Sequence, residues 1–392
     1  MEKKKNDFIA QGSILAIASI LVRVMGMIYR IPMTAIIGDK GNGFYSYAYS
    51  VYTILLLLSS YSLPLAVSKM VSAKAQLGQW RNVKRVFICA IAFAIGIGTT
   101  FGLIVLIGAQ FFTRVFFHSE LAAIALRFMA PTILIMALLG VFRGFFQGLQ
   151  NTLPTAVSQI VEGLINAIMS VVFAYFLFDF GHGMDAAGGT TDLGYAWGAA
   201  GGAIGTGAGA LAGLIFCFIL FVAYRKILAV NISRDKTGTQ QEYGDIFRLM
   251  LSIALPVILS TALYNLIELV DGSLFNNIMA SKGMEDVKDS MWGAYNAKAL
   301  LLVHIPVSIS SAMAVSLVPT LTAAYALGDE QTAKSKVHAI LRFISILAFP
   351  SAVGLLVLAN PIIKTLFSGD TSAASTYLQV VCPAVITFSF ST

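Results

Sequence analysis

The chain has 392 residues, of which 57% are hydrophobic and 11% charged, and its formal net charge is +7. Soluble domains carry roughly 25% charged residues, so this composition excludes a soluble globular protein and indicates an integral membrane protein. The cysteines lie in separate apolar segments without metal-ligand spacing, so we predict neither disulfides nor a metal site, and we expect no cofactor.

Apolar segments long enough to cross a membrane recur along the whole chain. A hydrocarbon core of about 30 Å requires about 20 apolar residues in a helix. This criterion predicts ten spans, at residues 8–36, 44–73, 84–113, 121–149, 154–178, 195–224, 247–280, 291–326, 337–366 and 373–392. Several are expected to bend, because they contain interior prolines that membrane helices tolerate: Pro64, Pro131, Pro256, Pro306 and Pro350.

The distribution of lysine and arginine predicts the orientation of these spans. Positive charge is retained in cytoplasmic loops. With the N-terminus placed in the cytoplasm, most of the 26 Lys and Arg residues, Arg143 among them, fall on the cytoplasmic side. Topology therefore accounts for the net charge, and nucleic acid is not expected as a partner.

An internal repeat organises the chain. At an offset of 250, Gly43 and Tyr45 match Gly293 and Tyr295. At an offset of 252, the Ala130-Pro131 step, which is expected to bend span 121–149, matches Cys382-Pro383 in span 373–392. The offset covers six predicted spans, an even number, so the two copies share one orientation.

The repeat predicts an all-α fold of two parallel lobes around a central cavity. The expected N-lobe has six transmembrane helices at residues 1–230, residues 231–245 form a cytoplasmic linker, and the C-lobe covers 246–392. Compared with the first copy, the second stops soon after its proline step, so we expect a C-lobe of about four helices that is truncated.

The first predicted span carries two arginines on one helical stripe. Its members are small or cationic: Gly12, Ala16, Ser19, Arg23, Gly26 and Arg30. A guanidinium that faces lipid near the bilayer centre costs at least about 2.5–3.5 kcal/mol. Arg23 lies roughly 22 Å from the inner end of the span, so we predict that it faces an aqueous cavity lined by protein. Arg30 lies near the outer boundary, where its side chain could instead reach the head groups.

Further ionisable side chains fall in later spans. Asn265, Glu268 and Asp271 share one face of span 247–280, and Lys298 lies in span 291–326. Ionisable groups at this depth are functional candidates. The structural alternative is an ion pair between Lys298 and Glu268 or Asp271 that only locks the two spans together. Glu162, a lone acid in span 154–178, is a secondary candidate.

Residues 194–213 form the glycine-rich run GYAWGAAGGAIGTGAGALAG. No strand precedes it, which excludes a nucleotide-binding loop. Small residues at helical spacing instead predict close approach to a neighbouring helix. The loops are too short for a catalytic domain, so we do not predict an enzyme, although one acting on lipid within the bilayer stays open.

The segment VRVMGMIYRIPMTAIIGDKGNGFYSYAYS, followed by LPLAVSKMVSAKAQLGQWRNVKRVF, resembles the first helices of MOP superfamily flippases, and FRGFFQGLQNTLPTAVSQIVEGLIN fits the same resemblance. The polysaccharide biosynthesis branch is the most similar. This resemblance implies two MATE-like lobes that alternate between inward-open and outward-open forms. Its implied substrate is a polyprenyl-pyrophosphate-linked oligosaccharide, such as a lipid II-like precursor of cell-wall peptidoglycan. A monomer in the plasma membrane, with cell-wall synthesis proteins as partners, is the corresponding expectation.

The resemblance also implies roles for individual residues. Arg23, Arg30 and Lys298 would bind the pyrophosphate, because forked guanidinium and ammonium donors suit that dianion. Glu268 or Asp271, with Asn265, would couple transport to Na⁺ or H⁺, or to the membrane potential. The alternatives are a MATE-type multidrug antiporter, for which acids and aromatics should dominate the cavity, and a non-transporting scaffold.

Overall fold

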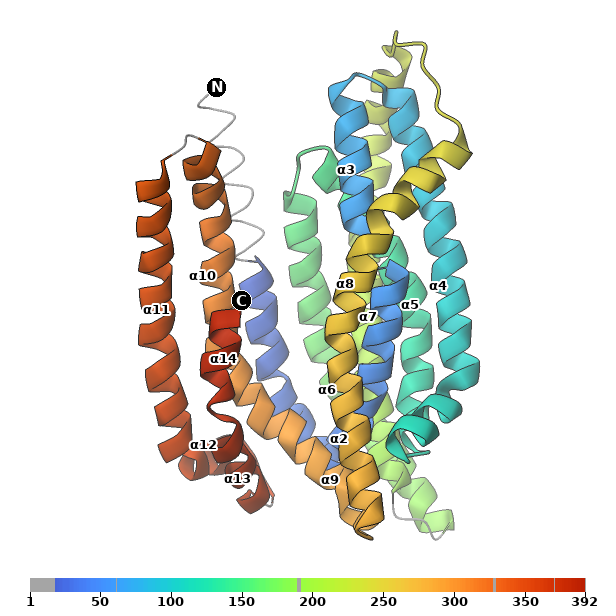
Figure 1. The fold of residues 1–392 in the computed structure, drawn as a ribbon. Coiled ribbons are helices and arrows are strands. Elements are labelled where there is room, and N and C mark those ends of the chain that lie inside the picture. The colour runs from blue at the N-terminus through green and yellow to red at the C-terminus, as the bar shows by residue number, and fades with distance from the viewer. Residues whose placement is uncertain (1–17, 61, 189–191, 327–328, 370, 392) are drawn as a thin grey trace. The chain divides into compact units, whose positions relative to one another are not determined.

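The computed structural model describes residues 18–60, 62–188, 192–326, 329–369 and 371–391. Within these ranges the chain is helical and contains no strand, which confirms the predicted all-α fold (Figure 1). A first helix covers Ala18–Ile28. The helices of the N-terminal part are α2 (Arg30–Ser60), α3 (Leu63–Gln76), α4 (Trp80–Phe117), α5 (Ala122–Gly148), α6 (Leu153–Gly188) and α7 (Leu193–Ser233). The remaining elements are α8 (Tyr243–Ser281), α9 (Glu285–Ala294), the π-helical segment η1 (Tyr295–Leu300), α10 (Leu301–Ala326), α11 (Glu330–Val357), α12 (Ala359–Leu366), α13 (Ser372–Val381) and α14 (Ala384–Ser391).

The described residues contain 7 helices that are long and apolar enough to cross a membrane, or up to 8 if the bent pair α13–α14 forms one span. The protein is therefore a multi-pass membrane protein. The predicted span 8–36 begins before the first described residue. In the predicted span 291–326, several side chains do not belong to the described part of the structure. The count of ten thus remains a prediction. The pair α13–α14 bends by 50° at Cys382-Pro383, where the repeat predicted a proline bend.

The first two predicted spans meet at a break inside α2. Gly38 has φ 62° and ψ −174° there, outside the helical region. A positive φ is accessible to glycine without a Cβ clash, so Gly38 can end one helix and let Asp39 begin the next. The break falls within the predicted connection at residues 37–43. Pro64 lies within the candidate span Arg30–Gln76, as predicted, and occupies the first turn of α3, where its missing N–H costs no helical hydrogen bond.

One compact unit consists of residues 1–43 and 289–392. In it, α10, α11 and α14 pack on one another (Figure 1). Their core includes the buried side chains of Val303, Ala348 and Val385, and Met27 and Ile31 from the start of the chain pack against this core. The helix that carries Arg23 is thereby attached to the C-terminal helices of the same unit.

The other compact unit consists of residues 44–288. Its longest shared face lies between α6 and α7 (Figure 1). Side chains at Gly201, Gly205 and Gly209 of α7 would collide with the backbone of α6, because a Cβ at these positions would meet Phe173, Ser170 and Glu162, respectively. The close approach predicted from the glycine run is confirmed, and its four-residue spacing explains why one face of α7 makes it.

The segment between α7 and α8 is shorter than the predicted linker and is bound to the start of α4. The Asp235 carboxylate accepts hydrogen bonds from the Arg81 backbone N–H at 2.9 Å and from the Thr237 backbone and hydroxyl groups. Asn82 bonds the backbone of Thr239 and Gln241. The Arg81 N–H is the largest of the influences that lower the pKa of Asp235 to about 2.

The two compact units are defined by packing, and the first of them joins both ends of the chain. The lobes expected at residues 1–230 and 246–392 therefore remain a prediction.

Candidate substrate site

The two arginines of the first stripe lie in the compact unit that contains the C-terminal helices. Arg23 is exposed on the helix Ala18–Ile28, and Arg30 is half-buried at the start of α2. No carboxylate of the described ranges forms an ion pair with Arg23. Gly12 and Ala16, the first members of the stripe, lie outside the described residues.

A basic side chain of α10, His304, lies in the same compact unit as both arginines. Its ring stacks on the Phe388 ring at a centroid separation of 6.3 Å. His304 follows Lys298 by six positions in the sequence. The start of the chain and the η1–α10 segment therefore place several cationic or basic side chains in one compact unit.

Lys298 is buried and ion-paired. Its ammonium nitrogen lies 2.8 Å from each carboxylate oxygen of Asp39. The Lys298 side chain is 2% exposed, whereas that of Asp39 is 21% exposed. A buried ammonium requires such a partner, because burial removes its hydration. The structural alternative named Glu268 or Asp271 as the partner, whereas the structure shows Asp39 in that position.

The ion pair lies beside a crossing of two helix segments related by the internal repeat. A Cβ at Gly293 would meet the Asp39 carbonyl, and a Cβ at Gly43 would meet the Asp289 carbonyl. The repeat offset of 250 relates Asp39 to Asp289 and Gly43 to Gly293. The two contacts are therefore reciprocal: each copy places its glycine on the aspartate carbonyl of the other. Only glycine permits this backbone approach.

Lys298 itself lies in the π-helical segment η1, directly after α9. π-Helical segments are rare in proteins, and many of those that do occur lie at functional sites. Here the wider turn follows the tight crossing at Gly293. Together, the break at Gly38 and the π-helical turn determine where the carboxylate and the ammonium meet.

The candidate ion-coupling residues lie on α8, in the other compact unit. Glu268 and Asp271 are exposed, and Asn265 is half-buried. Ser50 donates a hydrogen bond of 3.3 Å to the Glu268 carboxylate, and the Asn265 amide donates one of 2.8 Å to the Thr261 carbonyl. Among the described residues, no group of three or more His, Cys, Asp and Glu side chains could hold a metal ion.

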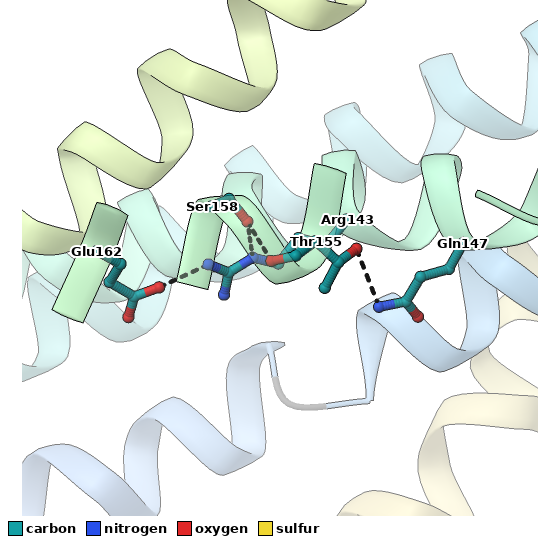
Figure 2. Close-up of polar contacts among 5 residues, drawn as sticks. All are labelled: Arg143, Gln147, Thr155, Ser158 and Glu162. Atoms are coloured by element: carbon teal, nitrogen blue, oxygen red, sulfur yellow. Dashed lines mark hydrogen bonds and ion pairs between the residues drawn. The ribbon is translucent and has the colours of Figure 1, made fainter. Parts of the chain in front are cut away.

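Glu162 is paired rather than alone. Figure 2 shows the Arg143 guanidinium of α5 pointing toward Glu162 and Ser158 of α6. The guanidinium lies 2.7 Å from the Glu162 carboxylate and 2.9 Å from the Ser158 hydroxyl. The Arg143 side chain is only 11% exposed, and the Glu162 side chain is 24% exposed. Arg143 therefore joins two packed helices, a role that its assignment to the cytoplasmic-side charges did not anticipate.

Sequence reasoning missed two partners, Asp39 and Arg143. For Asp39, the signal was the repeat offset, which pairs Asp39 with Asp289 as it pairs Gly43 with Gly293 but does not link Asp39 to Lys298. For Arg143, the signal was an acid within the neighbouring predicted span. Neither signal gives the rotation of one helix about its axis, and that rotation decides which side chains meet.

The helical arrangement is that of known membrane transporters. It is similar to the inward-facing conformation of a multidrug resistance MATE family transporter of the MOP superfamily, with a TM-score of 0.67 and 13% identity over 95% of this chain and 82% of that one. It is also similar to a MOP superfamily transporter from Pyrococcus furiosus described as having a binding pocket of reverse polarity, with a TM-score of 0.62 and 15% identity over 98% of this chain and 80% of that one. The chain therefore shares the helical fold of these transporters.

The family follows from the sequence match. A family model described as polysaccharide biosynthesis protein matches residues 8–324, and a second model with the same description matches residues 286–374. The chain belongs to the polysaccharide biosynthesis protein family.

Two relatives come from Bacillus subtilis (strain 168). The chain is 26% identical to the lipid II flippase MurJ over 394 residues, which cover 97% of this chain and 70% of the relative. It is 24% identical to stage V sporulation protein B over 391 residues, covering 98% and 71%, respectively. These relatives, together with the fold, support the resemblance inferred from the first two helices.

Proposed function

We propose that this protein is a flippase that moves a polyprenyl-pyrophosphate-linked saccharide, similar to lipid II, from the cytoplasmic to the outer leaflet by alternating access. It would act in the plasma membrane with a cytoplasmic N-terminus, supply cell-wall or surface polysaccharide synthesis, and carry out no covalent reaction. We further propose that it works as a monomer, in contact with cell-wall synthesis proteins.

The observation that carries this proposal is the exposed Arg23 on the apolar helix Ala18–Ile28, which lies in the same unit as Arg30 and Lys298. A polyprenyl-linked pyrophosphate presents two negative charges and several acceptor oxygens. Guanidinium groups bind such oxygens in a bidentate manner, so exposed arginines suit this head group. The lipid II flippase among the relatives supports the same substrate class.

Energy coupling belongs to the proposal as well. Glu268 and Asp271 are exposed carboxylates on a membrane helix, and Asn265 lies one turn before Glu268. We propose that these residues respond to Na⁺, H⁺ or the membrane potential. The same carboxylates favour the second candidate function, a MATE-type antiporter of organic cations, because cationic drugs require acidic partners.

The test is complementation of a strain depleted of its lipid II flippase by the full-length gene. Wild type should restore growth, Arg23→Lys should restore it only in part, because an ammonium keeps the charge but not the bidentate donors, and Arg23→Ala should not restore it. Arg114→Ala is the matched control, because Arg114 is 70% exposed and forms only a surface ion pair with Glu120. Membrane levels of each variant are measured by immunoblotting.

The outcomes separate the alternatives. Rescue by Arg23→Ala at normal levels would contradict a role of this arginine in translocation and would favour a scaffold. Loss of drug resistance in Glu268→Gln with intact wall assembly would favour the antiporter. If the wild type fails to rescue growth, the transported substrate would instead be the precursor of another surface glycan.

A further inference from the structure

The two side chains of the Lys298–Asp39 ion pair differ in their exposure. Lys298 is 2% exposed and Asp39 is 21% exposed, and the ammonium contacts both oxygens of the carboxylate. An anion that approaches this pair from the exposed side therefore meets the carboxylate before the ammonium. To bind Lys298, the anion must displace Asp39.

The backbone around Asp39 resists displacement. Its carbonyl lies against Gly293 with no room for a Cβ, and the reciprocal contact joins Gly43 to Asp289. The Asp39 backbone is therefore fixed, and only its side chain can turn away from Lys298. A carboxylate tethered in this way has an effective concentration on the order of millimolar or above at the ammonium.

This arrangement discriminates among anions by their charge. A phospholipid such as phosphatidylglycerol carries one negative charge, as the Asp39 carboxylate does, so it gains nothing from Coulomb attraction when it replaces the carboxylate. A polyprenyl pyrophosphate diester carries two charges, and its attraction to an ammonium at equal distance is about twice as large. A repulsive carboxylate at a binding site is a known means of rejecting the wrong ligand.

We propose that Asp39 is a specificity-determining residue, which excludes singly charged phospholipid head groups from Lys298 and yields to the pyrophosphate of the transported lipid. This inference rests on the proposed function. It addresses a problem that any cationic lipid site has, because singly charged phospholipids greatly outnumber the precursor in a membrane.

The experiment uses the full chain in nanodiscs of phosphatidylethanolamine with or without about 30 mol% phosphatidylglycerol. The probe is a fluorescent polyprenyl pyrophosphoryl-N-acetylglucosamine. For the wild type, phosphatidylglycerol should change the apparent Kd of the probe by less than about twofold. For Asp39→Asn, it should raise the apparent Kd of the probe about tenfold or more. Asp39→Glu keeps the carboxylate and should behave as the wild type. In Asp39→Asn/Lys298→Met the added sensitivity should disappear, because the ammonium is gone.

A second measurement needs no variant and does not depend on the folding of Asp39→Asn. At equal total lipid charge, phosphatidylinositol 4-phosphate should compete with the probe on the wild type, and phosphatidylglycerol should not. Equal competition by the two lipids, or equal phosphatidylglycerol sensitivity of wild type and Asp39→Asn, would overturn this inference alone. Absence of probe binding by the wild type in either nanodisc would overturn the proposed function and this inference with it.

Discussion

The buried Lys298 ammonium and the half-buried Asp39 carboxylate form an ion pair across 259 positions of sequence, with the ammonium 2.8 Å from each carboxylate oxygen. The pair connects the break after Gly38 to the π-helical turn η1. Removing one partner of such a pair leaves the other charge without compensation, which is costlier than removing both.

We therefore expect Asp39→Ala to lower the free energy of unfolding by about 3–5 kcal/mol. The double variant Asp39→Leu/Lys298→Met should recover most of this loss, because it removes both charges and keeps the volume. Unfolding by SDS titration in mixed micelles measures both. An Asp39→Ala protein as stable as the wild type would mean that Lys298 finds another partner readily.

The reciprocal glycine contacts predict a strong dependence on side-chain size. Gly293→Ala should destabilise the protein by about 1–3 kcal/mol, because its Cβ would overlap the Asp39 carbonyl. Gly354→Ala in α11 is the matched control, since a Cβ there meets nothing within 4 Å. The control should be neutral or stabilising by up to about 1 kcal/mol. Similar melting temperatures for the two variants would argue against the tight crossing.

The Arg143–Glu162 pair should show measurable coupling in a double-mutant cycle. Each alanine variant is expected to lower the free energy of unfolding by about 2 kcal/mol, and the two losses should not add, because either change breaks the same bond. The exposed pair Arg114–Glu120, at 3.3 Å, provides the comparison cycle. Its coupling should stay below about 1 kcal/mol. Additive losses at Arg143 and Glu162 would show that the bond contributes little.

Residues 234–242, the linker between α7 and α8, should become more accessible to protease in acid. The pKa of Asp235 is lowered to about 2 from 3.8, so its carboxylate stabilises the linker above about pH 4, and this contribution is lost as the pH falls toward 2. Pepsin cleavage within residues 234–242 reports the loosening. Asp235→Asn should be cut faster than wild type near pH 4, and the ratio of the two rates should approach one near pH 2. A ratio that stays constant over this range would mean that the carboxylate does not hold the linker.

Patterns set by spacing along one helix could be predicted from the sequence. The four-residue glycine stripe from Gly201 to Gly209 predicted the contact of α7 with α6, and the repeat predicted the bend at Cys382-Pro383. Both depend on the geometry of a single element, which the order of its residues determines.

Features that require two distant elements could not be predicted in the same way. Asp39 lies in a predicted connection, and nothing in its neighbourhood identifies Lys298 as its partner. The π-helical turn has no residue signature of its own in YNAKAL. Arg143 resembles a topology-determining charge because it lies near the end of a span, and only the packing of α5 on α6 shows that it faces Glu162.

The exchange of contacts between residues 39–43 and 289–293 is the pattern that identical subunits make across a dyad, where residue i touches j and j touches i. In a homodimer, a lysine introduced on one side would necessarily appear on both. A single polypeptide is free of that constraint, and here the position that the repeat pairs with Lys298 is Ala48. Joining the halves in one chain thus allows one cation where symmetry would impose two.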